Sequence, residues 1–138
     1  MGDLELAMSP SQLRYPILRR NLESAVDCFA DQAFQARVWS NPTISTPEGR
    51  WDFIEAFEFV VDDLGSADLS GLVGEVLVDQ EELILFSELH SALLAVAALE
   101  RSGQRLRYDE VSETREWSAV REAAVRLRSA LASDDVSR

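Results

Sequence analysis

Residues 79–103, DQEELILFSELHSALLAVAALERSG, decide the fold of this chain. Apolar side chains recur there at intervals of three and four and cover well over half of a helix circumference, which is typical of a buried helix. Asp79, followed three residues later by Glu82, forms the D-x-x-E pattern of a helix N-terminus. The apolar residues are Leu83, Ile84, Leu85, Phe86, Leu89, Leu93, Leu94, Val96 and Leu99. We therefore expect a helix over about 79–101 to be the central buried element of an all-α bundle.

The segments on either side predict the helices that pack against this one. Pro16 suits the first turn of a helix, and Asp31 suits the N-cap of the next. The tripeptide TPE at 46–48 marks a third entry, and Gly65 stands where a left-handed cap would close that helix. The predicted helices cover 16–30, 32–39, about 47–64, 79–101 and about 113–132. The expected fold is a compact bundle of four to five helices.

The last predicted helix carries apolar residues at 3-4-3-4 spacing. This seam can pack inside the bundle or against a second copy of the chain. The seam residues are Trp117, Val120, Ala124, Leu127 and Leu131. No stretch shows the sustained alternation of a β-strand, although EVLV at 75–78 leaves a short strand open within the irregular segment 66–78.

The size of the chain predicts one domain. With 138 residues and 46% hydrophobic residues, it is long enough to bury a real core. We expect a single domain over 1–138, with frayed tails at 1–10 and 133–138. No apolar run is long enough to span a bilayer and no secretory signal is recognisable, so we expect a cytoplasmic protein without membrane contact. The single cysteine, Cys28, predicts a buried, inert thiol.

The net charge of −12 is distributed unevenly along the chain. Residues 41–100 contain thirteen acidic residues against Arg50 alone, whereas the charges of the two flanking segments cancel. A block of one sign repels phosphate and favours basic partners, so nucleic-acid binding is disfavoured. The alternative is that acidic helix faces only keep a small protein soluble.

Residues 51–65, WDFIEAFEFVVDDLG, combine this negative charge with aromatic rings. Read as an ideal helix, the segment has one apolar face, while Trp51 and Phe59 project into the acidic face, away from the core. Aromatic rings surrounded by carboxylates can recognise an arginine-rich or lysine-rich partner. The candidate partner-binding residues are Trp51, Asp52, Glu55, Glu58, Phe59 and Asp62. The alternatives are an additional packing layer, or a second copy, that covers both rings.

The sequence shows no catalytic signature. Ser87 stands three residues before His90, the only histidine, so the Glu-x-x-His pairs of a di-metal carboxylate bundle are absent. No phosphate-binding glycine loop or cysteine cluster occurs, and the acidic helix face lacks a ligand-rich loop. We expect no cofactor, no metal and no catalysis, with His90 as a hydrogen-bonded core or interface residue. A thiol–imidazole pair of Cys28 and His90 has the required residue types, but the spacing does not support it.

Four segments occur in an order that resembles a small actinobacterial family of uncharacterised helical proteins. They are LESAVDCFADQAFQARVW, WDFIEAFEFVVDDLG, LVGEVLVDQEE and REWSAVREAAVRLRSAL. The resemblance covers about 16–132 and depends on Gln35, Val38, Trp39, Asp62, Asp63, Gly74, Val76, Leu77, Glu81, Trp117, Val120 and Ala124. It implies an all-α cytoplasmic domain and supplies no activity. The chain departs from the family at NPTISTPEGR (41–50), where Tyr and Asp are usual.

These observations favour a protein that acts by contact rather than by catalysis. The first hypothesis is an adaptor or an immunity-type inhibitor that binds a basic partner through the acidic and aromatic helix face. Similarity in size and acidity to bacterial immunity proteins supports it at the level of class. The second hypothesis is a homo-oligomer that buries the same patch or the seam of the last helix. The third is a small enzyme that uses His90.

Overall fold

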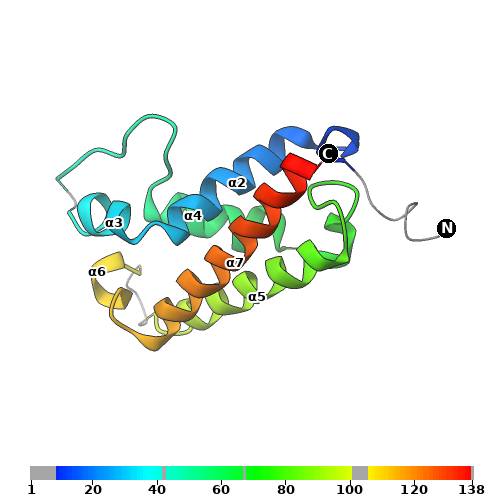
Figure 1. Cartoon of the computed structure of the whole chain (residues 1–138). Helices are drawn as coiled ribbons and strands as arrows, with labels where there is room; N and C mark the ends of the chain where they lie inside the picture. Colours follow the sequence, from blue (N-terminus) through cyan, green and yellow to red (C-terminus); the bar gives the residue numbers. More distant parts are fainter. Residues whose placement is uncertain (1–8, 42, 67, 101–105, 138) are drawn as a thin grey trace.

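The computed structural model describes residues 9–41, 43–66, 68–100 and 106–137 as an all-α bundle (Figure 1). The main helices are α2 (Pro16–Ala30), α4 (Phe53–Glu58), α5 (Gln80–Ala97) and α7 (Arg115–Ser137), with α3 (Gln32–Phe34) and α6 (Tyr108–Val111) as short ones. Two π-helical segments, Gln35–Trp39 and Phe59–Leu64, continue α3 and α4, and 3₁₀ turns form at Pro10–Gln12 and Leu69–Leu72. The described residues contain no strand, only an isolated bridge between Val73 and Leu77. No described helix has both the length and the hydropathy needed to cross a membrane.

Aspartates cap three of the helices, and two of these caps were predicted. Asp31 accepts a hydrogen bond from the Phe34 amide at 2.9 Å, and Asp79 accepts one from the Glu82 amide at 2.9 Å. The Glu82 side chain, however, does not complete the capping box, because it accepts the Val78 amide at 2.8 Å instead.

The third cap shows that the predicted helix entry at 46–48 is wrong. The helix begins at Phe53, where Asp52 caps it by accepting the Glu55 amide at 2.8 Å. Gly49, between the expected and the observed start, has a φ of 83°, a left-handed conformation that a right-handed helix does not allow. Residues 46–51 therefore lead into the helix as a loop.

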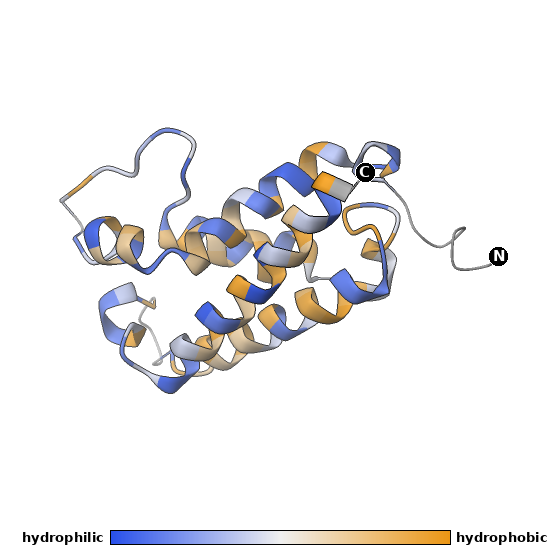
Figure 2. Cartoon of the chain, viewed as in Figure 1, coloured by the Kyte–Doolittle hydropathy of each residue, from blue (hydrophilic) through white to orange (hydrophobic). Residues whose placement is uncertain are grey.

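The bundle packs most tightly around α7, which lies between α2 and α5 (Figure 1). All five residues of the predicted seam on this helix are buried, so the seam serves the interior of one chain. Helix α5 contributes Phe86, Leu89, Leu93 and Val96 to the same core. Its outer face is open, since Ile84 is 54% exposed and Leu94 is 46% exposed. Figure 2 shows apolar residues recurring along both helices.

The ends of the two long helices differ from the prediction. Helix α5 stops at Ala97, so the predicted continuation is wrong for residues 98–100, and residue 101 lies outside the described part. Helix α7 runs to Ser137, so 133–137 is not a frayed tail. Its last turn is held in place because Asp135 accepts a hydrogen bond from Arg19 on α2 at 3.1 Å. The predicted N-terminal fraying of 1–10 falls mostly on residues 1–8, which are not described.

Gly65 ends the π-helical segment, but not with the predicted left-handed cap. Its φ of −98° is accessible to any residue, so that prediction is wrong. The reason for glycine here is space, because a Cβ at this position would overlap the His90 ring and lie 2.8 Å from the Val61 carbonyl oxygen. Gly65 thus lets this segment approach α5 closely.

Candidate functional site

The structure contradicts the expected outward position of Trp51 and Phe59. Phe59 is only 5% exposed and belongs to the main core, and the half-buried Trp51 packs against it with ring centroids 5.0 Å apart. Trp51 precedes the helix cap and is therefore not on the helix. From Phe59 onward the helix is π-helical, so an ideal α-helical projection no longer gives the direction of its side chains. The two rings are the additional packing layer, and Phe59 offers no surface to a partner.

The predicted carboxylates divide into two groups. Asp52 and Glu55 form the capping box of α4, because each side chain accepts the other residue's amide, at 2.8 and 3.5 Å. Glu58 and Asp62, together with Asp63, are exposed and form no ion pair within the described residues. We refer to Glu58, Asp62 and Asp63 as the acidic row.

The one arginine of the acidic block does not neutralise this row. Arg50 donates hydrogen bonds to Asp27 at 2.8 Å and to Asp31 at 3.1 Å, both at the end of α2. Its guanidinium also lies over the ring of Phe34, 4.1 Å from the centroid. The charge of the acidic row therefore faces solvent without compensation from Arg50.

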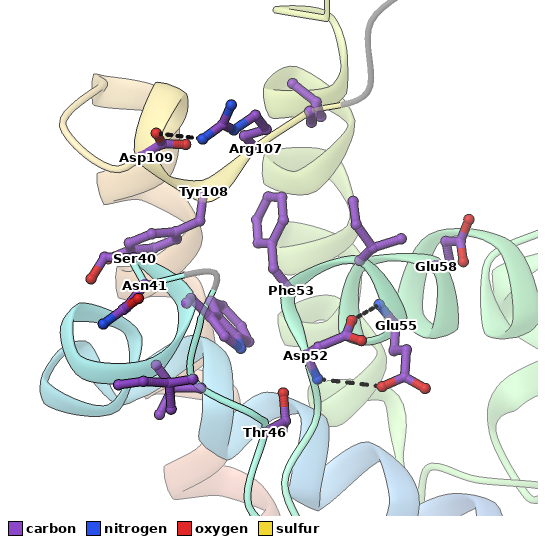
Figure 3. A pocket seen from close by; sticks show the side chains of 15 residues that line it. Ser40, Asn41, Thr46, Asp52, Phe53, Glu55, Glu58, Arg107, Tyr108 and Asp109 are labelled. Carbon is purple, nitrogen blue, oxygen red and sulfur yellow. Dashed lines mark hydrogen bonds and ion pairs between the residues drawn. The ribbon is translucent and has the colours of Figure 1, made fainter.

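A groove of about 610 Å³ begins at the end of this row, between α4, α6 and the loop that follows Trp39 (Figure 3). Phe53 points from α4 toward α6, while Tyr108 points from α6 toward Ser40 and Asn41. The lining residues are Val38, Trp39, Ser40, Asn41, Ile44, Thr46, Asp52, Phe53, Ile54, Glu55, Glu58, Leu106, Arg107, Tyr108 and Asp109. Aromatic and aliphatic side chains thus form the floor, and carboxylates form one edge.

Among the described residues, Arg107 is the one arginine that lines the groove, and it is already paired. Arg107 donates a hydrogen bond to Asp109 at 3.2 Å, and both residues are largely exposed at the α6 side of the groove. This pair contributes no net charge. Of the described lining residues, Asp52, Glu55 and Glu58 on the α4 side therefore contribute an excess of negative charge to the groove.

Trp39 is the centre of the aromatic floor. Its indole makes edge-on contacts, with centroid distances of 5.6–6.2 Å, to Phe29, Phe34, Phe53, Tyr108 and Trp117. Such perpendicular contacts are the favoured geometry for aromatic pairs. The Trp39 indole N–H donates to the Trp51 carbonyl oxygen at 2.9 Å. These contacts fix the ring in one orientation.

Gln35 supports the floor from below. It is fully buried, and its amide group donates to the carbonyl oxygens of Cys28 at 2.8 Å and Phe29 at 2.7 Å. Its carbonyl oxygen accepts from the Trp117 indole at 3.1 Å and from the Tyr108 hydroxyl at 3.4 Å. Burial raises the pKa of Tyr108, which keeps the phenol neutral and able to donate. The groove is therefore preformed by a satisfied buried network.

Comparison with known proteins gives a family but no activity. A family described as a domain of unknown function, DUF7945, matches residues 13–138. The chain belongs to the DUF7945 family. This confirms the resemblance to an uncharacterised family. No curated protein and no solved structure matches the chain.

In this DUF7945 domain, no described residue forms an ion pair or hydrogen bond with His90 that would make it an acid or base catalyst. The half-buried ring stacks on Phe86, and its Nε2 is buried without a hydrogen-bond partner among the described residues. The expectation of a hydrogen-bonded histidine is therefore wrong at this atom. Cys28 packs instead with Phe34 and Val38, and burial raises the pKa of its thiol. The predicted burial of Cys28 is confirmed, and the structure does not bring the thiol and the imidazole together.

The sequence analysis missed a cluster of charged residues in this DUF7945 domain, where the first turns of α2 and α5 meet the last turn of α7. Arg19, only 2% exposed, donates to both carboxylate oxygens of the fully buried Glu82, at 2.8 and 2.9 Å. Burial disfavours both charges, but the hydrogen bonds between them outweigh it, raising the pKa of Arg19 and lowering that of Glu82. The available signal was the position of Arg19 inside the apolar stripe of α2.

This cluster also contains three carboxylates that lie close together. Ligand atoms of Asp79, Glu82 and Asp134 lie within 4.8 Å of one another. The Arg19 guanidinium already occupies both oxygens of Glu82 and supplies positive charge at this point. We therefore assign no metal ion to these residues.

Proposed function

We propose that this protein is a non-catalytic cytoplasmic binding protein that recognises a basic protein partner. Either an adaptor or an immunity-type inhibitor fits this description. One observation carries the proposal: a row of carboxylates that forms no ion pair with any described residue leads into a preformed groove with an aromatic floor. A segment that carries arginine or lysine beside apolar side chains has the chemistry to fill both parts.

The protein contains an internal example of this recognition chemistry. Arg50 lies over Phe34 and donates to two carboxylates, Asp27 and Asp31. In the described part of the groove, Asp52, Glu55 and Glu58 border aromatic side chains, and no described cation lies over these rings. An arginine of a partner would find the same combination of ring and carboxylate there.

The structure weakens the case for self-association through the two surfaces considered from the sequence. The seam of α7 is buried within the chain, and Phe59 lies in the core. The acidic row would also repel a second copy of itself. The same negative charge disfavours nucleic acid.

A peptide-binding experiment tests this proposal. The probe is a fluorescein-labelled peptide of alternating Arg and Leu, and a peptide of alternating Glu and Leu is its control. We expect the basic peptide to bind, and raising the salt concentration from 20 to 200 mM to weaken binding, because exposed charges are screened. Fluorescence anisotropy gives the dissociation constants.

Two variants locate the binding surface. Glu58→Gln with Asp62→Asn removes two unpaired carboxylates without touching the Asp52–Glu55 cap. At about 0.2–1 kcal/mol per exposed charge, we expect binding to weaken by roughly two- to thirtyfold. Glu48→Gln with Glu113→Gln removes the same charge from exposed positions that do not line the groove. Equal weakening by both pairs would reduce the effect to net charge and contradict the proposed surface.

A further inference from the structure

The last turn of α7 is tied to two other helices by the charged cluster around Arg19. This guanidinium donates through Nη1 and Nη2 to Glu82, the third residue of α5, and through Nε to Asp135 on α7 at 3.1 Å. Nη1 also donates to the Val76 carbonyl oxygen at 3.1 Å. One buried side chain of α2 thus holds together three elements that are far apart in the sequence.

A second carboxylate of α2 faces the same turn. Glu23 lies one helical turn after Arg19, and its Oε2 lies 3.7 Å from Arg19 Nε, the same nitrogen that donates to Asp135 at 3.1 Å. Glu23 and Asp135 also line the same surface hollow. Two carboxylates that converge on one N–H group repel each other when both are charged, whereas a proton on one of them allows a hydrogen bond between the two. Arg19 cannot neutralise both, because Glu82 already takes its two terminal nitrogens.

The charged groups around this carboxylate pair come from all the packed elements. Glu82 of α5, the N-cap Asp79 of that helix and Asp134 of α7 add negative charge close to Arg19. On the outer side, Arg128 of α7 is directed to Asp27 of α2, with a hydrogen bond of 3.3 Å. Arg20 lines the surface hollow that contains Glu23 and Asp135, but it makes no ion pair in the described part of the chain.

We propose that the last turn of α7 is a pH-sensitive latch, held against α2 by a proton that Glu23 and Asp135 share and loosened when that proton is lost. Burial, followed by the hydrogen bond and the charge of Asp135, raises the pKa of Glu23 from 4.5 to about 8. Above that pH both carboxylates are charged, and they repel each other across the contact between α2 and α7.

The direction of the effect follows from proton linkage. The closed turn binds the proton up to about pH 8, whereas an opened turn releases it near the ordinary glutamate value of 4.5. The stabilisation is complete below pH 4.5, is lost progressively as the pH rises, and is absent above about pH 8. One proton linked to opening gives about a tenfold change in the opening equilibrium per pH unit within that window.

Amide hydrogen exchange of residues 133–136 tests the latch in the full chain, without any partner. We expect the protection factors of the wild type, already corrected for intrinsic exchange, to fall about tenfold per pH unit from pH 6 toward pH 8 and then to level off. Glu23→Gln should keep its protection at every pH, because the glutamine amide donates permanently to Asp135. Glu48→Gln, an exposed loop variant with the same loss of charge, should behave like the wild type.

Two results would overturn the latch. One is a wild-type protection that stays constant over this pH range, and the other is a Glu23→Gln variant that retains the wild-type slope. A direct measurement covers the case in which the variant does not fold. The side-chain carboxyl carbon of Glu23, followed by ¹³C NMR in the wild type, should titrate near pH 8, and a midpoint near 4.5 would eliminate the shared proton.

Discussion

At the scale of single residues, Gly65 and His90 form a contact that only glycine permits. The His90 ring occupies the position where a Gly65 side chain would begin, so any larger residue forces either the ring or the backbone to move. This contact also explains why a histidine without a hydrogen bond on Nε2 stays in place between Phe86 and the chain at Gly65.

Replacing Gly65 measures the energy of this contact. We expect Gly65→Ala to lower the free energy of unfolding by about 1–3 kcal/mol through overpacking. Adding His90→Ala should recover part of that loss, but not all, because the new Cβ still meets the Val61 carbonyl oxygen. Urea denaturation of the two single variants and the double variant gives the coupling energy. Strictly additive effects would show that the ring does not limit this position.

At the scale of helices, the pair of Arg19 and Glu82 joins α2 to α5. Removing one partner of a buried ion pair costs about 3–5 kcal/mol, because the other charge remains buried without compensation. Glu82→Gln should therefore destabilise, by less than the full penalty because Asp135 still accepts from Arg19 Nε. Adding Arg19→Met should restore part of the stability, because the buried guanidinium charge is then removed. The glutamine can still accept the Val78 amide. Urea denaturation measures both, and a double variant weaker than Glu82→Gln alone would contradict a charge-based penalty.

The helices show which features the sequence could predict. The caps at Asp31 and Asp79 and the seam of α7 follow from local patterns, and all three are confirmed. The position of Phe59 did not follow, because an α-helical projection does not include a π-helical segment or a covering ring from a preceding loop. The last turn of α7 could not be predicted either, because it depends on Arg19, more than a hundred residues away in the chain.

The candidate site was predictable only in part. The carboxylates of α4 were identified, but two of them cap the helix, and the groove beside them needs α6, which the periodicity did not predict. Gln35 and Tyr108 meet across 73 positions of sequence, and no local pattern reports such a contact.

At the scale of the whole molecule, the buried seam of α7 argues for a single chain in solution. We expect light scattering at micromolar concentration to give the mass of one chain, 15.4 kDa. The reason is that the largest apolar surfaces pack inside the bundle, while the acidic row repels a second copy. A mass near twice that value would restore the homo-oligomer and direct attention to Ile84 and Leu94 on the open face of α5.

The position of Trp39 makes the protein a fluorescent sensor of its own groove. Its indole borders the groove, while Trp117 is completely buried and Trp51 packs against Phe59. Because indole emission depends on the polarity around the ring, a ligand that displaces water from the groove floor would alter mainly the light from Trp39. Replacing Trp51 with phenylalanine would then leave Trp39 as the emitter at the groove, while Trp117, whose indole donates to Gln35 below the floor, is kept. A shift in the emission wavelength would thus report ligands of this DUF7945 domain directly.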